Sequence, residues 1–180
     1  SFAETIKRLN VVPVSISYEY DPCDGLKAAE LQARAAEDYV KKAGEDVESI
    51  MRGIALPKGR VHIEIGKPLQ GEFEDAEAVA HALDQQIIQN YRLFPPSLLA
   101  IEHLLSLSKA MQSLRDDSIA GFQAVAQQAK DTLAAVDSQD LARQASEFSA
   151  RLAHYPAQLQ RIILEMYANP LLSKYKYSTD

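Results

Sequence analysis

Cysteine, aromatic residues, positive charge and long apolar runs are all scarce in this chain. Its one cysteine, Cys23, excludes an internal disulfide and any zinc site built from several cysteines. The 19 Lys and Arg residues are outnumbered by 25 Asp and Glu, and no long basic run exists, which argues against nucleic acid as the main partner. The longest uncharged apolar stretch, residues 93–101, is far shorter than the roughly 20 residues of a membrane-spanning helix.

The composition that remains is that of an ordinary folded chain. Its 180 residues are 47% hydrophobic and 24% charged, which provides enough apolar material for a core and allows one domain or somewhat more. Residues 1–5 do not resemble a signal peptide, because no basic run leads into an apolar stretch. We expect a reducing, cytoplasmic location, with peripheral contact at the inner face of the cell membrane left open.

Strand signals are confined to the first part of the chain. Residues 11–20 are rich in β-branched and aromatic residues and predict a strand that is buried at its start, with Pro13 at its beginning or beside a bulge. Residues 60–65 alternate and predict a second strand. Helices are predicted between the two strands, from Pro22 to Lys42 and over residues 45–54. Together these elements form a crossover unit, which would be right-handed if the strands are parallel.

Every later signal is helical. Apolar residues at helical spacing predict further helices near residues 76–91, 98–105, 122–136, 141–152 and 156–169. The third and fourth of these repeat in steps of four and three, which is typical of two packed antiparallel helices. The predicted fold class is an α/β fragment, with two strands and crossover helices that complete a larger sheet, followed by an all-helical C-terminal bundle. We place the domain boundary between residues 1–93 and 94–180.

Two strands are too few for a stable sheet, because sheets usually contain about 4–6 strands and a two-stranded sheet is marginal in water. The apolar start of the first strand indicates cover on both faces and neighbours along its edges. No other segment of the sequence supplies those neighbours. We therefore expect this chain to be the C-terminal portion of a larger α/β protein, whose missing N-terminal half is its main partner.

The histidines do not form a recognisable catalytic or metal-binding pattern. The four are His62, His81, His103 and His154, and none is followed five residues later by an acid that would orient a general base. His62 and Glu64 lack the paired cysteines of the zinc deaminases, so we interpret them as solvated surface. His81 and Asp84 lack a third ligand nearby. We predict no metal site and no catalytic residue.

Other chemistry-bearing residues have structural interpretations. We assign Glu19, Asp21 and Asp24 to helix capping and solvation rather than to a bound cation. Cys23 lies beside acids and not bases, which predicts a poor nucleophile. The helix that follows Pro96 is apolar nearly all round and is predicted to be buried, with contact to lipid or an acyl chain as the alternative.

Residues 11–16, Val-Val-Pro-Val-Ser-Ile, resemble the fourth sequence block of the glycerol-phosphate and lysophosphatidate acyltransferase family. Further stretches in order strengthen the match, at residues 17–24, 58–62, 65–69, 90–95 and 166–170. Together they resemble a bacterial subgroup of acyltransferase-like proteins with an extra helical C-terminus. The resemblance covers most of the chain.

The resemblance implies a parent enzyme that moves a fatty acyl group from acyl-CoA or acyl carrier protein to a glycerol-phosphate-type alcohol in phospholipid synthesis, with no other cofactor. The family's His-x-x-x-x-Asp and Arg-containing blocks precede the Val-Pro-Val strand, and neither occurs here, so no catalytic residue carries over. Only Val12, Pro13, Val14 and Ser15 match a family block. Their implied role is to frame the acyl or substrate groove.

The expected function is thus that of a non-catalytic C-terminal portion of an acyltransferase, inactive by itself. An alternative from a different class is a helical interaction or regulatory domain, in which the heptad-like face from Phe122 to Val136 binds a partner protein or forms a homo-oligomer. A third hypothesis is a small-molecule domain in which Arg60 and Lys67 hold an anionic ligand.

Overall fold

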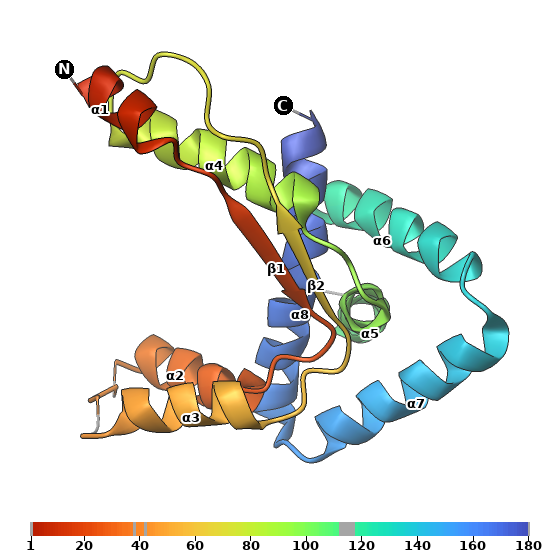
Figure 1. Ribbon diagram of the computed structural model, residues 1–180. Coiled ribbons are helices and arrows are strands. Elements are labelled where there is room, and N and C mark those ends of the chain that lie inside the picture. Colours follow the sequence, from red (N-terminus) through yellow and green to blue (C-terminus); the bar gives the residue numbers. More distant parts are fainter. Residues whose placement is uncertain (1, 38, 42, 112–117, 180) are drawn as a thin grey trace. The chain divides into compact units, whose positions relative to one another are not determined.

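The computed structural model describes residues 2–37, 39–41, 43–111 and 118–179, and those residues form eight α-helices and one two-stranded sheet (Figure 1). In chain order the elements are α1 (Phe2–Leu9), β1 (Val14–Tyr18), α2 (Asp24–Ala35), α3 (Glu45–Ala55), β2 (Val61–Ile65), α4 (Ala76–Asn90), α5 (Pro95–Met111), α6 (Ser118–Ala134), α7 (Ser138–Ala153) and α8 (Ala157–Thr179). The predicted fold class is confirmed: two strands near the N-terminus are followed by helices alone.

The chain divides into two compact units, each built from segments that are distant in sequence. Unit 1 comprises Ser1–Ser17, Val61–Arg92 and Ser173–Asp180, and unit 2 comprises Tyr18–Arg60 and Leu93–Leu172. The long helix α8 begins in unit 2 and ends in unit 1. The domain boundary predicted from the sequence, between residues 1–93 and 94–180, separates two contiguous domains, whereas these units are discontinuous in sequence. That boundary stays a prediction.

The two strands are antiparallel (Figure 1). The Gly66 N–H donates to the Pro13 carbonyl at 2.8 Å, and at the other end of the ladder the Glu19 N–H donates to the Arg60 carbonyl at 2.9 Å. The connection is therefore not the right-handed crossover that parallel strands would require. Pro13 directly precedes β1, as predicted from its missing N–H.

Helix α4 packs on one side of the sheet within unit 1. The Asp75 side chain caps its N-terminus by accepting the Ala78 N–H at 2.8 Å. At its C-terminus, where the last carbonyls have no partner inside the helix, the Gln89 carbonyl accepts a hydrogen bond from Lys174 Nζ at 2.7 Å. The end of α8 is thereby fastened to α4.

Unit 2 has its apolar core around α5. The first half of α5 is buried, as predicted, and it packs against both α6 and α7. The buried side chains of α5 and α6 include Leu98, Leu99, Ile101, Val125, Ala126, Ala129 and Leu133. The pattern predicts α6 packed directly on α7; instead both helices contact α5, and they diverge from their connecting turn (Figure 1). The side chain of Phe122 lies outside the described residues.

Three helix boundaries differ from the prediction. Helix α2 begins at Asp24, beyond the turn in which the Asp21 side chain accepts the Cys23 N–H at 2.7 Å, and it ends at Ala35 before the left-handed residue Glu37. Helix α8 continues through Pro170, because buried residues on both sides of the proline pack against the core and outweigh one missing hydrogen bond. Helix α1 is not predicted by the sequence reading.

Candidate functional site

The sheet of unit 1 has one covered side and one open apolar side. The register places Val14 opposite Ile65 and Ile16 opposite Ile63, so these side chains project to the same side. With two neighbours they define what we call the apolar sheet face: Val12, Val14, Ile16, Val61, Ile63 and Ile65. These six side chains are 37% to 70% exposed. Contiguous exposed apolar surface of this kind is typical of an interaction or ligand-binding site.

The opposite side of β1 is polar and fully covered. Ser15 and Ser17 are buried, and each hydroxyl has a specific partner at the end of α4. Ser15 Oγ donates to the Ile87 carbonyl at 3.1 Å, and Ser17 Oγ accepts the Arg92 N–H at 2.9 Å. Ser15 therefore satisfies a carbonyl of the last turn of α4, and Ser17 satisfies an N–H just beyond that helix, so that both serines hold β1 against its C-terminal end. Neither hydroxyl is presented as a nucleophile.

The four residues predicted to frame a groove divide between the two sides of β1. Val12 and Val14 belong to the apolar sheet face, whereas Pro13 and Ser15 are buried on the other side. Pro13 lies so close to Gly66 that a Cβ at that glycine would sit 2.8 Å from Pro13 Cγ, so the close approach of the strands requires glycine there. The groove-framing role itself stays a prediction.

Unit 2 contains a buried polar cluster around Asp24, whose side chain is 1% exposed. Asp24 Oδ2 accepts hydrogen bonds from Arg151 Nε at 2.6 Å and from the Tyr167 hydroxyl at 3.2 Å. Asp24 Oδ1 accepts from the Gly25 N–H at 2.7 Å and from the Tyr155 hydroxyl at 2.9 Å. Capping and solvation, the roles expected for Asp24, do not describe it: it joins the start of α2 to α7 and α8.

The Asp24 cluster is closed to further chemistry. Both carboxylate oxygens already accept two hydrogen bonds each, and the Tyr167 hydroxyl also accepts the Asp21 N–H at 2.8 Å. Burial and then the charge of Asp24 raise the pKa of Tyr167 well above its ordinary value, so its hydroxyl remains a donor. Sequence reasoning could not find this cluster, because Arg151 and Tyr167 lie 127 and 143 residues from Asp24.

A second polar network in unit 2 joins Glu19 to Arg60 and Gln144. The Arg60 guanidinium donates to Glu19 Oε1 at 2.7 Å and to Gln144 Oε1 at 2.9 Å, and its carbon lies 5.3 Å from the centre of the Phe94 ring. Burial alone would raise the pKa of Glu19, but the hydrogen bonds and charge of Arg60 outweigh it and hold that pKa below its ordinary value. Arg60 is thus committed to protein groups rather than to an anionic ligand.

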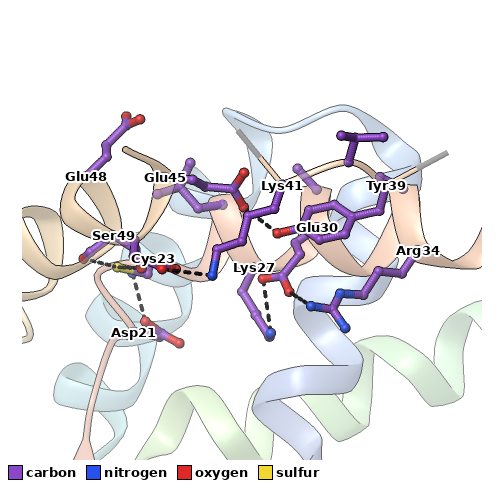
Figure 2. A pocket seen from close by; sticks show the side chains of 15 residues that line it. Asp21, Cys23, Lys27, Glu30, Arg34, Tyr39, Lys41, Glu45, Glu48 and Ser49 are labelled. Atoms are coloured by element: carbon purple, nitrogen blue, oxygen red, sulfur yellow. Dashed lines mark hydrogen bonds and ion pairs between the residues drawn. The ribbon is translucent and has the colours of Figure 1, made fainter. Parts of the chain in front are cut away.

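An open cavity of about 610 Å³ lies between α2 and α3 (Figure 2). Most of its charged side chains have partners: Lys27 and Arg34 pair with Glu30, and Lys41 pairs with Asp46. Glu45 accepts a hydrogen bond from the Tyr39 hydroxyl, and Glu48 pairs with Arg52 outside the lining. At its inner end Cys23 Sγ donates to the Ser49 carbonyl at 3.4 Å. The cavity is therefore lined mainly by charged side chains that already have partners, together with a few apolar ones. None of its described side chains is arranged to bind a ligand.

The histidines take ordinary surface and packing roles. His62 Nε2 lies 3.5 Å from Glu64 Oε2, on the side of β2 opposite to the apolar sheet face, and both side chains are substantially exposed. His81 contacts the Tyr177 ring at a centroid distance of 5.9 Å, and His154 Nδ1 is 2.7 Å from the Ala150 carbonyl. Within the described part of the chain, no three metal-binding side chains gather into a site.

No protein-family model, no curated protein and no solved structure matches this chain. Of the helices in the described ranges, none combines the length and apolar character needed to cross a membrane. Support for a function therefore comes from the apolar sheet face and from the sequence segments that form it.

Proposed function

We propose that this chain is the non-catalytic C-terminal portion of a cytoplasmic acyltransferase that acts in phospholipid synthesis. The parent enzyme transfers a fatty acyl group from acyl-CoA or acyl carrier protein to a glycerol-phosphate-type alcohol, in peripheral contact with the inner face of the membrane. The observation that carries the proposal is the apolar sheet face. It is formed partly by Val12 and Val14, the two outward residues of the segment that resembles the acyltransferase family.

The chemistry of the apolar sheet face suits this role. Six side chains with no polar atoms form a flat patch, and each methylene of an acyl chain that leaves water for such a surface gains about 0.8 kcal/mol. A flat face provides only one wall of a groove, so a second layer must close it. In this proposal that layer, together with the catalytic histidine and the phosphate-binding arginines, belongs to the N-terminal half of the parent.

The proposal assigns different tasks to the four residues of the Val-Pro-Val-Ser segment. Val12 and Val14 contribute to the acyl-binding wall. Pro13 and Ser15 position that wall, Pro13 through its contact with Gly66 and Ser15 through its hydrogen bond to the Ile87 carbonyl. The chain supplies no general base in this reaction.

Acyl transfer by the isolated chain and by the product of the complete native gene tests the proposal. With radiolabelled acyl-CoA or acyl carrier protein and glycerol phosphate or lysophosphatidate, we expect no transfer by this chain alone. We expect transfer by the complete gene product, whose reading frame should encode a His-x-x-x-x-Asp block upstream. Transfer by the isolated chain, or an inactive complete product, would overturn the proposal.

A pair of matched variants of the complete gene product tests the role of the sheet face. Val14→Asp should weaken the use of long-chain acyl donors at least tenfold, because it places a carboxylate in the acyl-binding wall. Val47→Asp makes the same change at a side chain that is 64% exposed on α3, and it should have no such effect. Equal effects of the two variants would argue against an acyl-binding wall.

No structural observation favours the alternative of a helical interaction domain. The heptad-like face that motivates it is occupied inside unit 2, where Ala126, Ala129 and Leu133 are buried. A partner helix would have to displace this core before it could bind there.

A further inference from the structure

Helix α3 carries an exposed apolar stripe along one side. Its four members recur at helical spacing, and they are Val47, Ile50, Met51 and Ile54. These side chains are 60% to 74% exposed, and no residue of α3 is fully buried. We call the four residues the α3 stripe. The whole stripe belongs to unit 2, so it is a different surface from the apolar sheet face of unit 1.

The opposite side of α3 is the side that contacts the start of α2. Ser49 Oγ donates to Cys23 Sγ at 4.0 Å (Figure 2), and a Cβ on Gly53 would lie 3.9 Å from the same sulfur. Ser49 and Gly53 are about one turn apart, and at 3.6 residues per turn they point away from the α3 stripe. Because α3 makes this contact through small and polar residues, its apolar residues are left on the outside.

The charges of α3 are opposite at its two ends. The last turn contains Arg52, and just beyond it the Lys58 ammonium donates to two carbonyls at the C-terminal end, at 3.2 Å each. The acidic residues of the first turn are Glu45, Asp46 and Glu48. Glu48 and Arg52 form an exposed ion pair at 2.8 Å, which leaves both groups accessible to further charges.

We infer that the α3 stripe joins two copies of this chain as an antiparallel pair of helices. Around a twofold axis beside Ile50, Val47 of one chain would meet Ile54 of the other, and both stripes would be buried. The acidic first turn of each helix would lie beside the basic end of its partner, with Glu48 of one chain near Arg52 of the other. The inference goes beyond the proposed function and does not depend on it.

Two other arrangements fit the charges of α3 less well. Helices that lie on membranes have basic residues on the polar face and aromatic residues on the apolar face. Helix α3 has three acidic residues against one arginine and has no aromatic residue, so its charge opposes the negative surface of an anionic leaflet. A parallel pair of copies would place the two acidic ends side by side.

The size of the α3 stripe sets the expected strength of the dimer. Four apolar residues and a few charged ones are far fewer than the roughly 20–30 residues a side of a standard protein interface. We therefore expect a reversible dimer, with a dissociation constant on the order of 100 µM.

Sedimentation velocity of the 180-residue chain over a range of concentrations tests the inference. The unmodified chain should shift from monomer to dimer as its concentration rises. Ile50→Asp should raise the dissociation constant about tenfold or more, because it places a carboxylate from each chain beside the axis. Ile63→Asp makes the same change at a side chain of β2 that is 59% exposed, against 60% for Ile50, and should leave the constant unchanged. A chain that stays monomeric at millimolar concentration, or equal effects of the two variants, would overturn the inference.

Charge variants provide a second measurement that leaves the α3 stripe itself intact. Glu48→Arg places like charges near Arg52 of the partner, and Arg52→Glu does so near Glu48. Each variant alone should dimerise less than the unmodified chain, whereas a mixture of the two should form heterodimers in preference to either homodimer. A mixture without that preference would contradict the pairing.

Disulfide cross-linking in a Cys23→Ser background determines the orientation of the two helices. Two copies of Ile50→Cys lie beside the axis and should link on oxidation. Two copies of Val47→Cys would lie about 10 Å apart along the helices, at 1.5 Å per residue, and should not link. Linking of both variants to the same extent would indicate a parallel pair and reject the antiparallel one.

Vesicle binding distinguishes the dimer from attachment to a lipid surface. A monomeric chain that binds vesicles of phosphatidylcholine and phosphatidylglycerol, and loses this binding in the Ile50→Asp variant, would assign the α3 stripe to lipid and overturn the inference. Val47→Asp should weaken the dimer while leaving the use of acyl donors unchanged, so that this surface and the acyl-binding wall are tested separately.

Discussion

Replacing Asp24 with alanine should destabilise unit 2 more than any change at an exposed ion pair. The substitution removes one carboxylate that accepts four hydrogen bonds, and it leaves the Arg151 guanidinium, the Gly25 N–H and two tyrosine hydroxyls without that partner. Removing one member of a buried ion pair costs about 3–5 kcal/mol. Because the Arg151 side chain is 28% exposed and can turn partly to water, we expect the lower end, about 3 kcal/mol.

Urea unfolding followed by far-UV circular dichroism measures this loss. With a slope of about 2 kcal/mol per molar urea, the midpoint should fall by about 1.5 M. The matched control is Glu165→Ala, which removes the partner of Arg161 in a largely exposed pair within α8 and should leave the midpoint unchanged.

The double variant Asp24→Ala with Arg151→Met tests the cause of the loss. If the cost arises from a stranded buried cation, the double variant should be more stable than the sum of the two single losses predicts, by at least about 1.5 kcal/mol. Additive losses, or a cost of less than about 1 kcal/mol for Asp24→Ala, would refute the assignment of Asp24 as the centre of the cluster.

Three further predictions concern other parts of the chain. Gly59→Ala should destabilise the protein by about 1–3 kcal/mol in the same assay, because Gly59 has φ +64° and a Cβ would lie 2.6 Å from Glu19 Oε2; a neutral effect would contradict this. The folded-state pKa of Glu19 is lowered, so its contribution to stability is present above its ordinary pKa of 4.5 and is lost as the pH falls through the lower folded value. Below about pH 5 the urea midpoint should therefore depend less on pH in the Glu19→Gln variant than in the unmodified chain. Ile16→Thr combined with Ile63→Thr should reduce binding of the apolar dye ANS without lowering the urea midpoint, because both side chains are about half exposed; unchanged dye binding would show that the dye reports another surface.

The elements that the sequence predicts well are those whose pattern needs no knowledge of their partners. The alternation of Val61, Ile63 and Ile65 defines β2, and the capping residue Asp137 defines the start of α7, where its side chain accepts the Gln139 and Asp140 N–H groups at 3.0 Å. Both signals are local, so the tertiary structure leaves them unchanged.

The orientation of β1 shows what a local pattern leaves open. Its apolar start indicates burial, yet in this chain the valines face outward and the serines face the core. Alternation separates two sets of side chains, but it does not state which set is covered, and here the hydroxyls of Ser15 and Ser17 are needed at the end of α4. Helix α8 illustrates the same limit of a local pattern. Pro170 predicts that the helix ends there, but tertiary packing stabilises the helix beyond the proline.

The candidate site was predictable in part for the same reason. The sequence singles out Val12 and Val14 only through the resemblance of their segment to a family block, and their neighbours Ile63 and Ile65 join them only through the strand register. The partners of Asp24 had no sequence signal, because a helix-start acid and an arginine far along the chain look like ordinary surface residues until the fold brings them together.

The assembly of unit 1 from both ends of the chain has a consequence for its synthesis. Residues 1–17 and 61–92 are synthesised long before Ser173–Asp180. The carbonyl of Gln89 at the end of α4 can accept its hydrogen bond from Lys174 only after that last segment has been made. Unit 1 can therefore reach its final form only after nearly the whole chain has been translated, while the hydrophobic patch on its sheet is exposed from the start. During that interval we expect chaperones that recognise extended apolar segments to bind the nascent chain.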